Sequence, residues 1–278
     1  MENTRLKALL KLLSNETDAH SRLVRKEIAD ALEQDPVGVK TALAEEFSTD
    51  APLHVVHALE EIYWDELARS LACFSAKINP DLEEGLKLLS QFTEPGSSNE
   101  HISQSIDGVA RALRPALLNA TGYTEIALIL GHYFFDTLGF KPLPTLLNVK
   151  DISFARFLRT RRGSGLCAAC LYSVVGARYG LDISIVDLAG RVLVHLQDFQ
   201  QDQSFFIDPL DNGKLLTQED CRSYLESRQL AWNDEFTVPL SSRQIVRRFI
   251  ANMIFVLNKV HDTRRLTYLR NYLEIIKN

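Results

Sequence analysis

The chain has 278 residues, of which 46% are hydrophobic and 24% are charged, as is ordinary for a soluble globular protein. This length suffices for one large domain, or for two to three small ones, with a substantial core. The formal net charge of -5 argues against a main role in binding nucleic acid or anionic membranes. No apolar run reaches the ~18 residues that a membrane span requires, so we expect no membrane partner.

The N-terminal sequence and the cysteines predict the compartment. MENTRLKALLKLL mixes acidic and basic residues and lacks a cleavage-type small-residue site, so we do not expect it to be a secretory signal. The cysteines are few and unevenly spaced, at Cys73, Cys167, Cys170 and Cys221. Such spacing favours reduced thiols over a disulfide framework, and we therefore expect a cytoplasmic protein.

Residues 1–95 are predicted to form an N-terminal helical region. Leucines recur there at helical spacing, and Asp35-Pro36 and Asn79-Pro80-Asp81 are typical helix starts. Short helices separated by such breaks are typical of a HEAT-like array, although the internal repeat is too weak to define. The polar, turn-rich segment 93–99 is the best candidate for a linker at the end of this region.

Four helices are predicted after the linker, over residues 101–118, 122–138, 151–161 and 166–179. Between the second and the third, we expect Lys141-Pro142-Leu143-Pro144 to be a loop, because proline is disfavoured inside regular elements. The glycine-rich turn Gly163-Ser164-Gly165 precedes the fourth helix.

The hydrophobic period changes from helical to strand-like after Gly180. Three β-branched or aromatic runs predict short strands, at 183–186, 192–196 and 205–207. Asn212-Gly213 predicts a turn after the third strand, and Thr217 is a typical cap for a helix through Leu225.

The last segment is predicted to be a pair of helices, over about 241–258 and 262–277. Helices around a small sheet make the predicted fold class α+β. We therefore expect three parts: an N-terminal helical region, a central core and a C-terminal helical pair, at 1–95, 96–240 and 241–278.

Five short motifs occur in a recognisable order. They are FFDTLGF at 134–140, RRG at 161–163, LY with RYGL between 171 and 181, FIDP at 206–209 and GKLL at 213–216. In this order the chain resembles the SirB-type bacterial family of transglutaminase-like proteins, over about a third of its length. The resemblance implies a transglutaminase-like core, made of a helix and a small antiparallel sheet, and the helical flanks resemble the family's more loosely.

The resemblance implies three site positions, the first of which is a cysteine at a helix start. There, backbone N–H groups and the helix dipole favour the thiolate. Cys167 follows the glycine-rich turn and is the candidate. Counted back from Arg178 and Gly180, however, the family pattern places the nucleophile at Gly165 or Leu166, so Cys167 would be rotated by roughly 100–200° around the helix. The other interpretation of Cys167 is a small buried residue.

Cys167 and Cys170 also form a C-x-x-C pair. Because it lies inside an apolar helix and lacks a second ligand pair, we expect neither redox nor metal chemistry there. No nucleotide-binding or metalloprotease motif occurs either, and we expect no cofactor.

The second position, a histidine on a strand, is occupied by Arg191. Arginine stays protonated at cellular pH and cannot act as a general base. His195 is four residues further along the same strand face, about 13 Å away, and His132 precedes the strands. The third position matches Asp208, for which we predict a bidentate, partly buried ion pair with Arg191.

The sequence therefore leaves two main hypotheses. The first is a non-catalytic, transglutaminase-like protein that serves as a protein-interaction or regulatory module with an unknown protein partner. The second is a thiol-dependent acyltransferase or amide hydrolase that uses Cys167 with an unforeseen histidine. A third possibility is an anion sensor that uses Arg191 and the basic cluster of Arg156, Arg159, Arg161 and Arg162.

Overall fold

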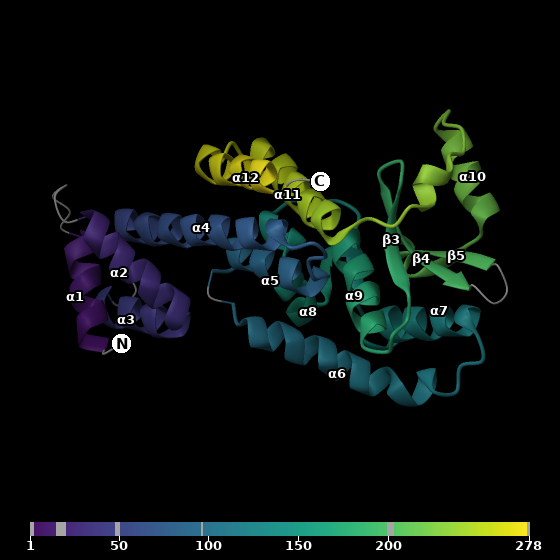
Figure 1. Cartoon of the computed structure of the whole chain (residues 1–278), viewed down its shortest axis with the longest axis horizontal. Helices are drawn as coiled ribbons and strands as arrows, with labels where there is room; N and C mark the ends of the chain where they lie inside the picture. Colours follow the sequence, from purple (N-terminus) through teal and green to yellow (C-terminus); the bar gives the residue numbers. More distant parts are fainter. Residues whose placement is uncertain (1–2, 15–20, 48–50, 96, 199–202, 277–278) are drawn as a thin grey trace.

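The computed structural model describes residues 3–14, 21–47, 51–95, 97–198 and 203–276. Its helices surround a small antiparallel sheet, so the predicted α+β class is confirmed (Figure 1). Among the described residues, no helix combines the length and apolar character needed to cross a membrane.

The N-terminal part is helical, as predicted. Its helices are α1 (Asn3–Ser14), α2 (Ser21–Gln34), α3 (Pro36–Phe47), α4 (Leu53–Ala76) and α5 (Leu82–Thr93). The first three pack together beside the start of α4 (Figure 1). Their buried side chains and those of α4 up to Ile62 form one hydrophobic cluster, which we call the N-terminal cluster.

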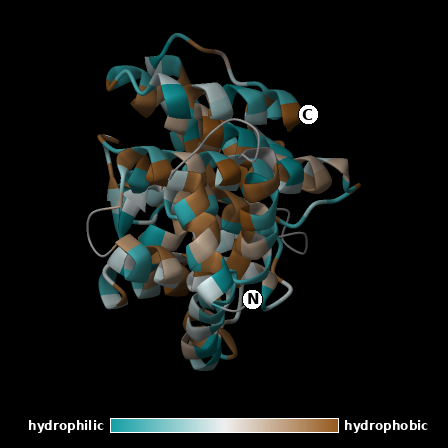
Figure 2. Cartoon of the chain, turned by 90° about the vertical axis from the view of Figure 1, so that its left-hand side faces the viewer, coloured by the Kyte–Doolittle hydropathy of each residue, from teal (hydrophilic) through white to brown (hydrophobic). Residues whose placement is uncertain are grey.

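A second, larger cluster forms the main core, and it continues across residue 95. Trp64 and Leu86, from α4 and α5, belong to the same cluster as Phe157 and Phe249. Figure 2 shows hydrophobic residues gathered toward the middle of the helical layers. Helix α5 ends at Thr93 as the linker prediction requires, while Gly96 lies outside the described residues. The division into three parts stays a prediction.

The middle of the chain supplies helices and two very short strands. They are α6 (Asn99–Leu117), α7 (Tyr123–Gly131), the π-helical turn η1 (His132–Thr137), β1 (Lys141–Leu143), the 3₁₀ turn η2 (Val149–Ile152), α8 (Phe154–Thr160), β2 (Arg162–Ser164) and α9 (Gly165–Ala177). The helix predicted over 151–161 starts only at Phe154, because Ser153 caps α8 by accepting the N–H of Arg156.

The loop predicted at Lys141–Pro144 is wrong for its first three residues. Lys141 to Leu143 form β1, which pairs in parallel with β2. Pro142 is tolerated because this two-stranded sheet leaves each strand with an unpaired edge, where no N–H is needed. The pairing fixes the chain just before α9 and so sets where that helix begins.

The main sheet is a four-stranded antiparallel meander in the order β3-β4-β5-β6. Its strands are β3 (Ile183–Leu188), β4 (Arg191–Asp198), β5 (Gln203–Asp208) and β6 (Lys214–Leu216). Because side chains alternate along a strand, the sheet has two different faces. Ile185, Val194 and Ile207 face the main core, against which α9 packs.

The other face of the sheet is covered by α10 (Gln218–Ser227). Leu193 and Phe206 pack there with Cys221 and Leu225 in a third hydrophobic cluster, which we call the α10 cluster. The chain ends with η4 (Asp234–Thr237) and the helical pair α11 (Ser242–Lys259) and α12 (Thr263–Ile275), which lies against α4 and α5 (Figure 1).

The packing of α5 against α11 can be tested with two helical glycines. A Cβ at Gly85 would lie 2.6 Å from Val246 Cγ2 and 3.1 Å from the Phe74 ring, whereas one at Gly108 would meet no heavy atom within 4 Å. We expect Gly85→Ala to lower the free energy of unfolding in urea by about 2 kcal/mol, through overpacking. The control Gly108→Ala should raise it by up to about 1 kcal/mol. Equal effects of the two substitutions would contradict this packing.

Candidate functional site

The β3–β4 hairpin positions Arg191, the first residue of β4. Its turn residues Ala189 and Gly190 both have positive φ, at 49° and 96°, as a tight two-residue hairpin turn requires. Asp187 accepts the N–H of Gly190 at 2.7 Å and also pairs with Arg248 of α11. The hairpin is therefore tied to the closing helices, and Arg191 enters the sheet from a fixed turn.

Arg191 and Asp208 form the predicted ion pair, through Nη2 and Oδ2. Asp208 is fully buried, while 29% of the Arg191 side chain is exposed. The guanidinium also lies over the ring of Tyr224 on α10, 4.9 Å from its centroid, in a cation–π contact. The pair is not the bidentate one that the sequence predicts, because the second carboxylate oxygen has another donor.

That donor is the backbone N–H of Leu210, which lies 2.9 Å from Oδ1 of Asp208. Asp208 thereby caps the 3₁₀ turn η3 (Pro209–Asp211). This turn places the Leu210 side chain against the start of α9. If Gly165 carried a Cβ atom, that atom would lie only 2.7 Å from Leu210 Cγ. Asp208 therefore joins two features: it balances Arg191 and it holds a leucine over one of the two alternative nucleophile positions.

Cys167 lies in the third position of α9 and is fully buried. Its N–H donates to Oγ of the capping Ser164 at 3.2 Å, and its thiol donates to the carbonyl oxygen of Ile152 at 3.4 Å. Burial raises the pKa of Cys167 to about 12, although the hydrogen bonds from Ser164 act in the opposite direction. The thiol is therefore neutral at cellular pH and acts as a hydrogen-bond donor.

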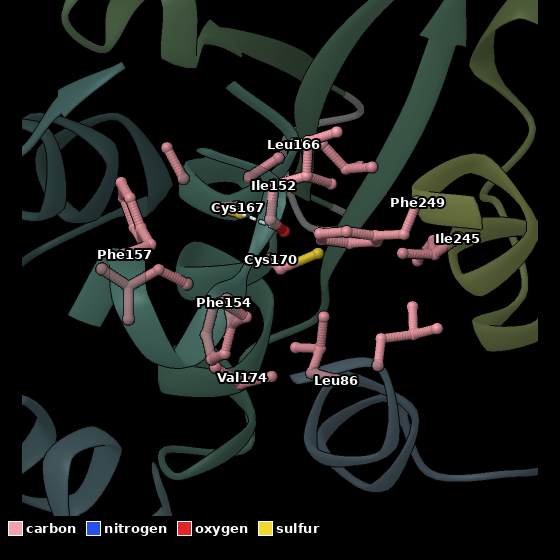
Figure 3. Packing of buried hydrophobic residues seen from close by; sticks show 14 of the residues in the cluster. Leu86, Ile152, Phe154, Phe157, Leu166, Cys167, Cys170, Val174, Ile245 and Phe249 are labelled. Carbon is pink, nitrogen blue, oxygen red and sulfur yellow. Dashed lines mark hydrogen bonds between the residues drawn. The ribbon is translucent and has the colours of Figure 1, made fainter. Parts of the chain in front are cut away.

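Both thiols of the C-x-x-C pair are enclosed by hydrophobic side chains. Figure 3 shows them among labelled residues of α5, η2, α8, α9 and α11, namely Leu86, Ile152, Phe154, Phe157, Leu166, Val174, Ile245 and Phe249. Cys170 is also fully buried, and burial raises its pKa well above the usual value. Leu166, the other alternative nucleophile position, is 3% exposed within the same core.

Within the described ranges, no histidine is hydrogen-bonded to Cys167. Among the described residues, no hydrogen bond joins this thiol to His195, Arg191 or Asp208. His132 lies on the surface of η1, where its Nδ1 is 2.9 Å from Asp136. His195 is buried on the α10 side of the sheet, stacked on Phe206 with ring centroids 4.9 Å apart.

A thiol that the sequence did not single out lies on the same side of the sheet as the ion pair. Cys221 of α10 is buried in the α10 cluster, and burial raises its pKa to about 11. The carboxylates of Asp220 and Asp208 raise this pKa further, whereas the guanidinium of Arg191 lowers it. Only the helical spacing of Cys221 and Leu225 could have indicated its burial in advance.

Two arginines of the basic cluster have partners within the protein. Arg159 makes two hydrogen bonds to the carboxylate of Glu94, at 2.7 and 3.2 Å, and Arg161 donates to the carbonyl oxygen of Leu138 at 2.7 Å. Within the described ranges, no three metal-ligating side chains gather into a possible metal site.

Residues 100–251, more than half of the chain, match a family model described as Transglutaminase-like superfamily. No curated protein and no solved structure matches the chain. The matched range begins within α6 and ends within α11, so it contains the whole sheet, α9 and the Arg191–Asp208 pair.

The order of thiol reactivity tests this description of the site. Cys73 is exposed, whereas the other three thiols are buried with raised pKa values. Because the thiolate is the nucleophile, we expect iodoacetamide at pH 7.5 to alkylate Cys73 first, and Cys167 only upon unfolding. Peptide mass spectrometry over time measures each site. Faster labelling of Cys167 than of Cys73 in the folded protein would contradict the buried, neutral thiol.

Proposed function

The chain belongs to the transglutaminase-like superfamily, and we propose that it is a non-catalytic member, of the SirB-type bacterial family, that acts as a protein-interaction or regulatory module. The observation that carries this proposal is the Arg191–Asp208 pair. A cysteine nucleophile of this kind needs a base whose imidazole is oriented by the aspartate. Here Asp208 pairs with Arg191, whose guanidinium is permanently charged and cannot accept a proton.

The nucleophile position supports the same conclusion. Leu210 covers Gly165, Leu166 is in the core, and Cys167 donates its thiol proton to a backbone carbonyl. In the third position of a helix, the dipole would favour the thiolate, but the complete burial of Cys167 outweighs it. The alternative, a thiol-dependent acyltransferase or amide hydrolase, requires Cys167 to move to the surface and to meet a base.

Turnover and stability measured together test the loss of catalysis. We expect no hydrolysis of p-nitrophenyl esters, and no amine incorporation into glutamine peptides, by the native chain or by Arg191→His. Asp208→Ala should lower the free energy of unfolding by about 3 kcal/mol, because it leaves Arg191 without its buried partner. Turnover by the native chain that Cys167→Ala abolishes, without a change in melting temperature, would contradict the proposal.

The interaction role rests on the N-terminal helices, which lie outside the matched range. A small apolar cavity of about 130 Å³ lies among α2, α3 and α4, and Leu43, Val56 and Tyr63 are among its lining residues. A cavity of this size and character fits one apolar side chain of a partner helix. We further propose that the protein works in the cytoplasm, since its described cysteines are free. We also propose that it does not bind nucleic acid, because its formal net charge is -5.

A charge in the apolar cavity tests the interaction role. Val56 is partly buried there, so we expect Val56→Glu to remove the partner that co-purifies with the native chain from the cells that produce it. The control Leu128→Glu places the same charge on α7, where Leu128 is 58% exposed, and should retain the partner. Circular dichroism must show that both variants are folded. Retention of the same partner by folded Val56→Glu would contradict the role of this cavity.

A further inference from the structure

A groove lies between α6 and α8. It consists of two hollows, of about 460 and 300 Å³, which share Ser105 of α6 and Leu158 of α8 in their linings and are therefore continuous. We call it the α6 groove. It follows α6 from Ser98 to Val109, which is a distance of about 16 Å at the rise of an α-helix. Figure 1 shows α6 along the lower edge of the molecule, with α8 above it.

The groove offers apolar side chains from both of its sides. They come from α6, from α8 and from the segment before β1, and they are Ile102, Val109, Leu138, Phe140, Ala155 and Leu158. Gly108 leaves space beside them, since a Cβ there would meet no heavy atom within 4 Å. Apolar side chains of a partner that displace water from such a hollow gain free energy.

Three cations lie at one end of the groove, and we call them the basic end: Lys141, Arg161 and Arg162. Arg161 lines the groove. Lys141 and Arg162 are direct partners in the parallel pairing of β1 with β2, and all three residues are exposed. Like charges that lie directly opposite each other on paired strands repel. An anion at this position would relieve that repulsion.

The charge of the basic end is not balanced by the described part of the chain. Among the described residues, no carboxylate forms an ion pair with Lys141, Arg161 or Arg162, and the lining of the groove contains no carboxylate. Arg161 donates to the carbonyl oxygen of Leu138 at 2.7 Å, which fixes its guanidinium without cancelling the charge. In contrast, Arg159 in the other hollow is balanced by Glu94.

The backbone of Arg161 supports a use for its side chain. Arg161 is the C-cap of α8 and has a left-handed conformation, with φ of 58°. Glycine is the usual residue at such a position, because a side chain makes the conformation less favourable. An arginine here keeps a positive charge at the end of the groove, in a protein whose formal net charge is -5.

We infer that the α6 groove binds a short segment of a protein partner that combines apolar side chains with acidic residues. The apolar side chains occupy the hollows, and the carboxylates pair with the basic end. At a strand rise of about 3.3 Å, the length of the groove fits about five extended residues. The inference rests on the proposed role as an interaction module. It gives that role a second surface, whose lining residues differ from those of the N-terminal cavity.

Fluorescence anisotropy of labelled peptides, measured with the full chain, tests this inference. The peptide EDELALALDED carries leucines between acidic ends, KRKLALALKRK has the opposite charge, and EDESGSGSDED lacks the apolar side chains. We expect the first peptide to bind saturably and each of the others to bind more weakly by about tenfold or more. Added salt should weaken the binding of the first peptide, because it screens exposed charges.

Two substitutions at Gly108 separate the effect of space from that of folding. Gly108→Phe places a ring in the groove, where a Cβ meets no heavy atom within 4 Å, and should weaken binding by about tenfold or more. Gly108→Ala is the matched control, which adds only a methyl group and should leave the affinity unchanged. Circular dichroism must show that both variants are folded.

The basic end is tested by charge removal. Arg161→Gln combined with Arg162→Gln should weaken binding by about tenfold, as the sum of two exposed ion pairs. The control Arg270→Gln removes an exposed charge from α12 and should have no effect. Val56→Glu should bind the peptide like the native chain, so failure of the groove and failure of the N-terminal cavity give different results.

Four outcomes overturn the inference. The first is that the peptide EDELALALDED does not saturate, and the second is that either other peptide binds as well. The third is that folded Gly108→Phe, or the folded double arginine variant, keeps the native affinity. The fourth is that short single-stranded DNA displaces the labelled peptide as well as the unlabelled peptide does, since the groove would then bind nucleic acid.

Discussion

The buried carboxylate of Asp208 is the constraint on which this part of the fold depends. A charge without exposure to water must be compensated, and Arg191 and the N–H of Leu210 divide the two oxygens of Asp208 between them. Arg191 also contacts the ring of Tyr224 on α10. Leu210 packs against Gly165 at the start of α9. One carboxylate therefore links the end of β5 to both helices that cover the sheet.

Packing, rather than the helix dipole, determines the protonation state of Cys167. Cys167 has the capped helix start that activates thiols in other proteins, with Ser164 at the cap. It nevertheless faces the main core, where burial raises its pKa to about 12. The same backbone arrangement can therefore hold a reactive or an inert thiol, according to whether the side chain faces water. This difference is one reason why we propose a non-catalytic use of the fold.

The α+β class could be predicted from the helical and strand-like hydrophobic periods, which are local properties of the sequence. The Arg191–Asp208 pairing could be predicted only through the family resemblance, which places the two residues at neighbouring site positions. The position of Leu210 over Gly165 could not, since it depends on how η3 meets α9. The strand pairing of Pro142 was missed for the same reason: proline disfavours strands, and only the partner strand β2 makes this one possible. The α6 groove is likewise a tertiary feature, formed by segments far apart in the chain.

The coupling energy between Arg191 and Asp208 tests the central claim most directly. It follows from a double-mutant cycle of Arg191→Met, Asp208→Asn and the double variant, measured by urea unfolding. An ion pair at a fully buried carboxylate predicts a coupling of about 2 kcal/mol, with the double variant less damaged than the sum of the single ones. A coupling near zero would contradict the account, because the two residues would then not depend on each other.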